Sequence, residues 1–100
     1  MKFIKTFEDI NYSDVRNLEK LIGKYVIIKN DNYLELAKII NILGVNVELY
    51  EYDWDNLYNG YVVSRFTKNI KDMKVINYFD TFKECVKEYD ILFKMQKYNL

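Results

Sequence analysis

Carboxylates and aromatic rings alternate closely in one stretch of the chain, Val45 to Tyr61 (VNVELYEYDWDNLYNGY). It holds the only Trp and four of the ten Tyr, and no Lys or Arg lies between Lys38 and Arg65. Tyr and Trp offer large contact areas at small entropic cost, and acids around them favour a partner rich in Lys and Arg. We therefore predict an acidic-aromatic surface that binds a protein with a basic groove, formed by Glu48, Tyr50, Glu51, Tyr52, Asp53, Trp54, Asp55 and Tyr58.

The same stretch has a purely structural interpretation. Aromatic side chains favour strands, and Trp is mostly buried on average. On this interpretation Tyr50, Tyr52 and Trp54 belong to a sheet face and the core, and the acids only solvate the opposite side. The sequence leaves both interpretations open.

A group of cations follows this stretch within ten residues, interrupted by Asp72. A solvated lysine face explains such a group, and so does a nucleic-acid patch that stacks bases on Tyr61, Phe66 or Tyr78. Four cations would make binding sensitive to salt but only modestly tight. The alternative nucleic-acid-binding residues are therefore Arg65, Lys68, Lys71 and Lys74.

The side chains needed for catalysis are sparse. The chain has no His and one Cys, Cys85, so the usual general base is missing and a thiolate metal site cannot form. Its three glycines are far apart, which rules out a phosphate-cradling loop. Asp53 and Asp55 are paired carboxylates, but they fall in a polar segment expected to stay solvated. We expect no enzymatic activity, no metal and no cofactor.

Composition favours a single domain over residues 1–100. The 15 basic and 15 acidic side chains balance, which argues against strong steering towards nucleic acid. A single Cys, no apolar leader and no apolar run near 20 residues indicate a cytoplasmic protein. Lys outnumbers Arg thirteen to two, and Ile, Asn and Tyr are abundant. Their AT-rich codons indicate a low-GC genome, such as a Firmicute or a phage or plasmid within one.

Hydrophobic periodicity and turn residues predict an α+β domain. Residues 33–43 also fit an amphipathic helix, but short polar turns beside neighbouring strands favour a strand. Asp80 is the expected N-cap of the last helix. The expected helices cover residues 13–22 and 81–97. The expected strands cover residues 2–7, 24–29, 33–43, 45–50, 61–66 and 74–78, with a loop over 53–60 and a turn or 3-10 segment over 67–73.

These elements predict a strongly curved antiparallel sheet or a small SH3-like barrel of four or five strands, with a helix near each end. The segment YLELAKIINILGVNVELYEYDWDNLY, residues 33–58, resembles the barrel of Tudor- and chromo-barrel-type modules. Both have a strand ending in Ala-Lys-Ile, a short turn, and a Val-rich strand leading to Tyr and Trp. The resemblance implies an aromatic cage for methylated Lys or Arg, formed by Tyr25, Tyr52 and Trp54 with Asp55 as the acid.

Three functions follow from these patterns. We favour a non-enzymatic protein-binding domain, encoded by a phage or mobile element as an inhibitor of the anti-defence or anti-CRISPR type. It would block a host protein through the acidic-aromatic surface. The second is a nucleic-acid-binding small β-barrel that uses the Arg65–Lys74 side. The third is a sponge for a small ligand, with pockets lined by Tyr.

Overall fold

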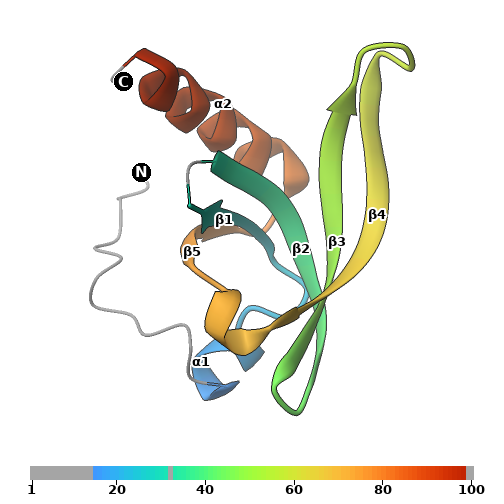
Figure 1. Ribbon diagram of the computed structural model, residues 1–100, viewed down its shortest axis with the longest axis vertical. Helices are drawn as coiled ribbons and strands as arrows, with labels where there is room; N and C mark the ends of the chain where they lie inside the picture. The colour runs from blue at the N-terminus through green and yellow to red at the C-terminus, as the bar shows by residue number, and fades with distance from the viewer. Residues whose placement is uncertain (1–14, 32, 99–100) are drawn as a thin grey trace.

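The computed structural model describes residues 15–31 and 33–98, and its strands form one antiparallel sheet in the order β4-β3-β2-β1-β5 (Figure 1). The α+β class is confirmed. The barrel alternative is wrong, because the sheet is open and has β4 and β5 as its edges. The elements are α1 (Val15–Glu19), β1 (Tyr25–Asn30), β2 (Tyr33–Leu43), β3 (Asn46–Asp55), β4 (Gly60–Asn69), the 3-10 helix η2 (Ile70–Asp72), β5 (Val75–Phe79) and α2 (Phe82–Tyr98).

Strand β1 is buried on both faces and divides the core in two. Val26 and Ile28 belong to a cluster with Leu18 and Leu21 near α1. Ile27, between them, belongs to a second cluster with Cys85 of α2. Successive side chains of a strand point to opposite faces, so one run of apolar residues supplies both layers. Figure 1 shows α1 and α2 on different sides of this central part of the sheet.

Residues 33–43 form a strand, as predicted. Leu36 packs in the cluster with α2, whereas Ala37 and Ile39 pack in the cluster with α1. The helical interpretation would put Leu36, Ile39 and Leu43 on one stripe, yet Leu43 is exposed. Burial on alternating faces therefore overrides the helical spacing of the same residues.

The β3–β4 hairpin is longer than the sequence predicts. Trp54 pairs with Tyr61, and Asp55 pairs with Gly60, so the loop expected over 53–60 shrinks to residues 56–59. Strand β4 continues to Asn69, so the turn expected over 67–73 is also shorter. Cross-strand pairing extends through both regions because the long partner strand β3 is available along their length. Figure 1 shows this hairpin as a long twisted ribbon at one side of the molecule.

The first helix is shorter than expected, because α1 ends at Glu19. Gly23 follows with a φ of 88°, a backbone conformation that glycine adopts without strain, and its N–H donates to the Ile39 carbonyl at 2.7 Å. The strand expected over residues 2–7, and residues 13–14 of the expected helix, lie outside the described residues.

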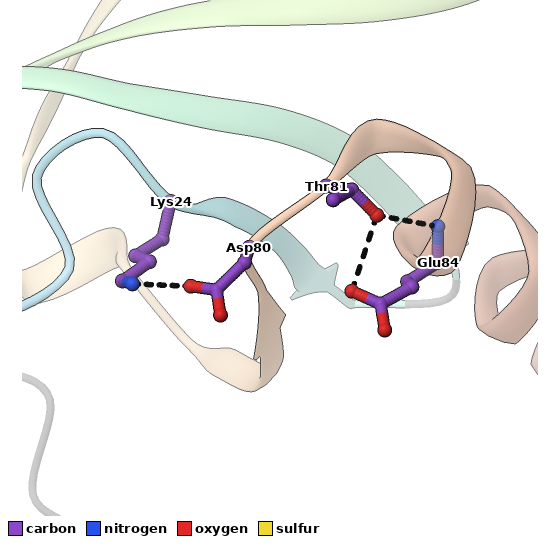
Figure 2. A network of polar contacts seen from close by, with 4 residues as sticks. All are labelled: Lys24, Asp80, Thr81 and Glu84. Carbon is purple, nitrogen blue, oxygen red and sulfur yellow. Dashed lines mark hydrogen bonds and ion pairs between the residues drawn. The ribbon is translucent and has the colours of Figure 1, made fainter.

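Thr81, rather than Asp80, caps the start of α2, so the predicted N-cap is wrong by one residue. The Thr81 hydroxyl accepts the Glu84 amide N–H at 3.2 Å and donates to the Glu84 carboxylate at 3.1 Å. Asp80 instead forms an ion pair with Lys24 at the start of β1 (Figure 2). Thr81 therefore caps the N-terminus of α2, and Asp80 links the start of this helix to the sheet through Lys24.

Candidate functional site

The tip of the β3–β4 hairpin is a polar turn organised by Asp55. Its carboxylate Oδ1 accepts the amide N–H groups of Leu57 at 2.9 Å and Tyr58 at 3.0 Å. Asn59 has a φ of 59°, which Asn tolerates better than most residues. This geometry explains why Asp and Asn are concentrated here: their short polar side chains replace backbone partners in a tight turn.

Trp54 lies beside this turn with its indole held in a defined position. The indole Nε1 donates to the Asn56 side-chain oxygen at 2.9 Å. Its ring meets the ring of Tyr61 edge to face, with centroids 5.2 Å apart. The side chain is nevertheless 53% exposed. Trp54 is therefore a fixed, half-exposed aromatic surface.

A row of rings connects Trp54 to the first residue of α2. Tyr61 contacts Phe82 with centroids 5.3 Å apart, and Phe82 contacts Tyr52 with centroids 4.8 Å apart. Tyr25 completes the row, 5.6 Å from Phe82. Such tilted and edge-to-face pairs add to area burial. Each sequence interpretation thus describes part of the stretch: Tyr52 packs in the sheet layer, whereas Trp54 faces solvent.

A cavity of about 420 Å³ lies between the hairpin and α2. Asp53 reaches it from β3, and Asp90 and Phe93 reach it from α2. Tyr89 is anchored there by a hydrogen bond from its hydroxyl to the Leu34 carbonyl at 3.4 Å. Carboxylates beside aromatic faces attract a cation through charge and through the ring quadrupole. The full lining is Leu36, Tyr52, Asp53, Trp54, Tyr61, Tyr89, Asp90 and Phe93.

The phenols of the cavity do not add to its charge. Burial is the main cause that raises the pKa of Tyr52, Tyr61 and Tyr89 above the usual 10.0, and the charge of Asp90 adds to the rise at Tyr61. These hydroxyls therefore stay neutral at pH 7. The negative charge of the cavity comes from Asp53 and Asp90 alone.

The other predicted acids have different roles. Glu48 pairs with Arg65 at 3.1 Å, and Asp55 serves the hairpin turn. Glu51 lies beside Glu35, whose Oε1 is 3.6 Å from the Lys68 ammonium. The eight predicted residues therefore do not form one acidic face, and only Tyr52, Asp53 and Trp54 of the set line the cavity. Tyr50 and Tyr58 are exposed outside it.

Glu51 is the most perturbed carboxyl of this stretch. Its pKa is raised from 4.5 to about 7, mainly by burial; the neighbouring Glu35 and Asp53 contribute to the rise, and Lys68 opposes it. The Glu35 Oε1 atom is buried and accepts no hydrogen bond from the described residues. Glu35 and Glu51 thus lie near the same cation, Lys68. This arrangement is electrostatically unfavourable when both carboxyls are ionised.

The cage implied by the Tudor-type resemblance is only partly assembled. Tyr52 and Trp54 line the cavity, but Tyr25 packs against Tyr52 and Phe82 with the Lys38 ammonium 5.1 Å from its ring centroid. Sequence reasoning missed the contribution of α2. There the helical spacing of Tyr89 and Phe93 looks like a core stripe, and their rings stack at 6.0 Å. Only the position of the helix beside the hairpin reveals that these rings line the same cavity as Trp54.

The predicted cations separate into two places. Lys68, Lys71 and Lys74 line a second cavity of about 430 Å³ together with Lys29, which the sequence analysis did not single out. Arg65 is not among the residues of that cavity and pairs with Glu48. Lys29 meets lysines that lie 39 to 45 positions further along the sequence because β1 pairs with β2 and with β5.

Cys85 and the acidic side chains are the groups of the described residues that bear on nucleophilic and metal chemistry. No group of three His, Cys, Asp or Glu side chains there is placed to hold a metal ion. Cys85 is fully buried, and burial, with the nearby Glu88 charge, raises its thiol pKa to about 12. A neutral, inaccessible thiol is a poor nucleophile. Within the described part of the chain, no helix combines the length and apolarity that crossing a bilayer would require.

Comparison with protein-family models, curated proteins and solved structures gave no match to this chain.

Proposed function

We propose that the chain is a non-enzymatic protein-binding domain that seats a Lys or Arg side chain of its partner between the β3–β4 hairpin and α2. The observation that carries the proposal is the lining of the aromatic cavity. Two carboxylates, Asp53 and Asp90, come from different elements, and five aromatic rings surround them. Cation–π attraction and charge pairing favour the same ligand, so their effects add.

The surroundings of the cavity suit a macromolecular partner. Leu57 is fully exposed, and Tyr58 is 71% exposed, beside the half-exposed Trp54. Large exposed apolar and aromatic side chains next to a pocket are typical of protein interaction sites. The long hairpin and the turn ordered by Asp55 hold these groups in place, which lowers the entropic cost of binding.

In biological terms, we propose an inhibitor from a phage or mobile element of a low-GC host, acting in the cytoplasm. A small chain with a fixed acidic-aromatic site could occupy the basic groove of a host defence protein. It would compete there for the Lys and Arg side chains that otherwise bind phosphate. The abundance of residues with AT-rich codons supports the low-GC origin, and the absence of His supports a binding role over an enzyme.

The only Trp of the chain lines the cavity, so its fluorescence reports binding without a label. We expect Nα-acetyl-arginine amide and Nα-acetyl-lysine amide to change Trp54 emission in a saturable way. Nα-acetyl-glutamate and Nα-acetyl-leucine amides at equal ionic strength should not. In the variant with Asp53→Asn and Asp90→Asn, the response to the cationic probes should fall several-fold.

A matched control removes two acids elsewhere, with Glu19→Gln and Asp72→Asn, both exposed in the wild-type chain. This control should bind the cationic probes as the wild type does. Immobilised protein should also retain one stoichiometric protein from a low-GC bacterial lysate, and the Asp53→Asn, Asp90→Asn variant should not. Equal binding of cationic and neutral probes, or recovery of nucleic acid alone, would contradict the proposal.

A further inference from the structure

A second cavity, the lysine cavity, shares no lining residue with the aromatic cavity. One side is the β1–β2 turn, with Lys29, Asn30, Asp31 and Tyr33. The other side is the end of β4 with η2 and the residue before β5, and it contributes Lys68, Lys71, Asp72 and Lys74. Four cations and two acids give this cavity a formal charge of +2 at pH 7.

Main-chain hydrogen bonds fix the frame that carries these lysines. The Lys29 N–H donates to the Lys74 carbonyl at 2.9 Å, joining the two sides of the cavity. The Asn69 side chain accepts the Lys71 N–H at 2.9 Å and so caps η2. Ile70 and Met73 are buried beneath this segment. The Cα positions of the lysines are thus set by the fold, although their side chains are long.

The positive charge is only partly compensated inside the chain. Lys68 has Glu35 as a partner, with its ammonium nitrogen 3.6 Å from a carboxylate oxygen. Among the described residues, Lys29, Lys71 and Lys74 have no carboxylate oxygen within 4.0 Å. Cations gathered around one cavity repel one another, and an anion that binds between them relieves this repulsion.

We propose that this cavity binds an anion with two or more adjacent phosphate groups, either a free polyphosphate or the phosphate chain of a nucleotide. Lysine ammoniums are compact point charges that suit phosphate oxygens approaching from several directions. A volume of about 430 Å³ falls within the range of small-ligand sites. A ligand with a single carboxylate, or a halide ion, would contact fewer of the three lysines, Lys29, Lys71 and Lys74.

The surroundings favour a compact ligand over a nucleic-acid strand. An extended backbone needs a continuous track of cations, but Arg65 lies outside the cavity and is already paired with Glu48. Asp31 and Asp72 also line the cavity, so the lysines do not form a continuous track of cations. Binding of a nucleic-acid strand is therefore the alternative that the test must distinguish.

The test titrates the full chain with tripolyphosphate, ATP and a dT12 oligonucleotide at constant ionic strength, and follows backbone amides by NMR. We expect tripolyphosphate or ATP to shift the amides of residues 29–31, 33 and 68–74 in a saturable way. The two probes distinguish a free polyphosphate from a nucleotide. The double substitution Lys71→Glu and Lys74→Glu should weaken binding by about tenfold, because each change removes an ammonium group and adds a carboxylate that repels phosphate.

The matched control is Lys83→Glu with Lys87→Glu, which makes the same change in net charge at two exposed positions of α2. It should leave binding of the phosphate probes within about twofold of the wild type. No saturable shift with either probe, or equal losses in both double variants, would refute the proposed site. Tighter binding of dT12, with shifts that spread along β4 to Arg65, would replace it with a nucleic-acid surface.

Discussion

Replacing Trp54 with Ala tests the geometry of the hairpin tip directly. A fully buried Trp removes up to roughly 200 Å² from water, so a side chain that is 53% exposed buries about half of that area. At about 25 cal/mol per Å² this burial contributes at most roughly 2.5 kcal/mol, and a compact unfolded state lowers the figure. We expect a loss of about 2 kcal/mol, including the edge-to-face contact with Tyr61.

Urea unfolding followed by far-ultraviolet circular dichroism measures this loss, because the variant has no Trp left to report fluorescence. The unfolding midpoint should fall while the dependence of free energy on urea stays unchanged. A buried Trp would cost about 3–5 kcal/mol on truncation to Ala. A loss in that range would refute the half-exposed placement of Trp54. No loss at all would refute its packing against Tyr61.

Leu57→Ala is the matched control, since Leu57 is at the same hairpin tip and is fully exposed. Its stability should stay within about 0.5 kcal/mol of the wild type. The two variants together separate the effect of losing a packed ring from any general sensitivity of the hairpin. Trp54→Ala has no Trp fluorescence, so its binding of the Arg and Lys probes must be followed by circular dichroism or NMR. We expect this variant to lose binding of both probes.

Two further predictions concern charge and helix capping. Because the folded chain holds the Glu51 proton up to about pH 7 and the unfolded chain only to about 4.5, the free energy of unfolding should fall as the pH rises between these values. After allowance for solvent screening, Glu51→Gln should be roughly 1 kcal/mol more stable than the wild type at pH 8 and similar at pH 4.5 by urea unfolding, and identical pH profiles would contradict this. Thr81→Ala should cost about 1 kcal/mol through the lost cap, whereas Asp80→Ala, at a side chain 74% exposed, should cost less than about 0.5 kcal/mol. Thermal unfolding of both variants compares these costs, and the reverse order would make Asp80 the cap.

The sequence predicts the strands well because their burial follows from local alternation. Leu36 and Ala37 are adjacent and apolar, and the fold places them on opposite faces of one strand, as a period of two requires. Element ends are predicted less well. The extension of β3 to Asp55 depends on pairing with β4, and no local residue preference records that pairing.

The candidate site was predictable only in part, for a similar reason. Asp53 and Trp54 stand out in the sequence, and both line the cavity. Glu48 looks equivalent to Asp53, yet the cross-strand position of Arg65 neutralises it. Asp90 looks like a solvated helix residue, and it gains its importance from the packing of α2 beside the hairpin. Tertiary contacts decide which acids act together, and the spacing of residues along the chain does not predict those contacts.

The zero net charge of the chain hides two local fields of opposite sign. Asp53 and Asp90 give the aromatic cavity a formal charge of −2, and the lysine cavity carries +2. Charges are screened over about 8–10 Å near physiological ionic strength, so the lining residues of each cavity make the largest contribution to the field that its ligand meets. Overall balance therefore argues against long-range steering but not against either site. It follows that added salt should weaken the binding of cationic probes at the hairpin and the binding of phosphate probes at the lysines.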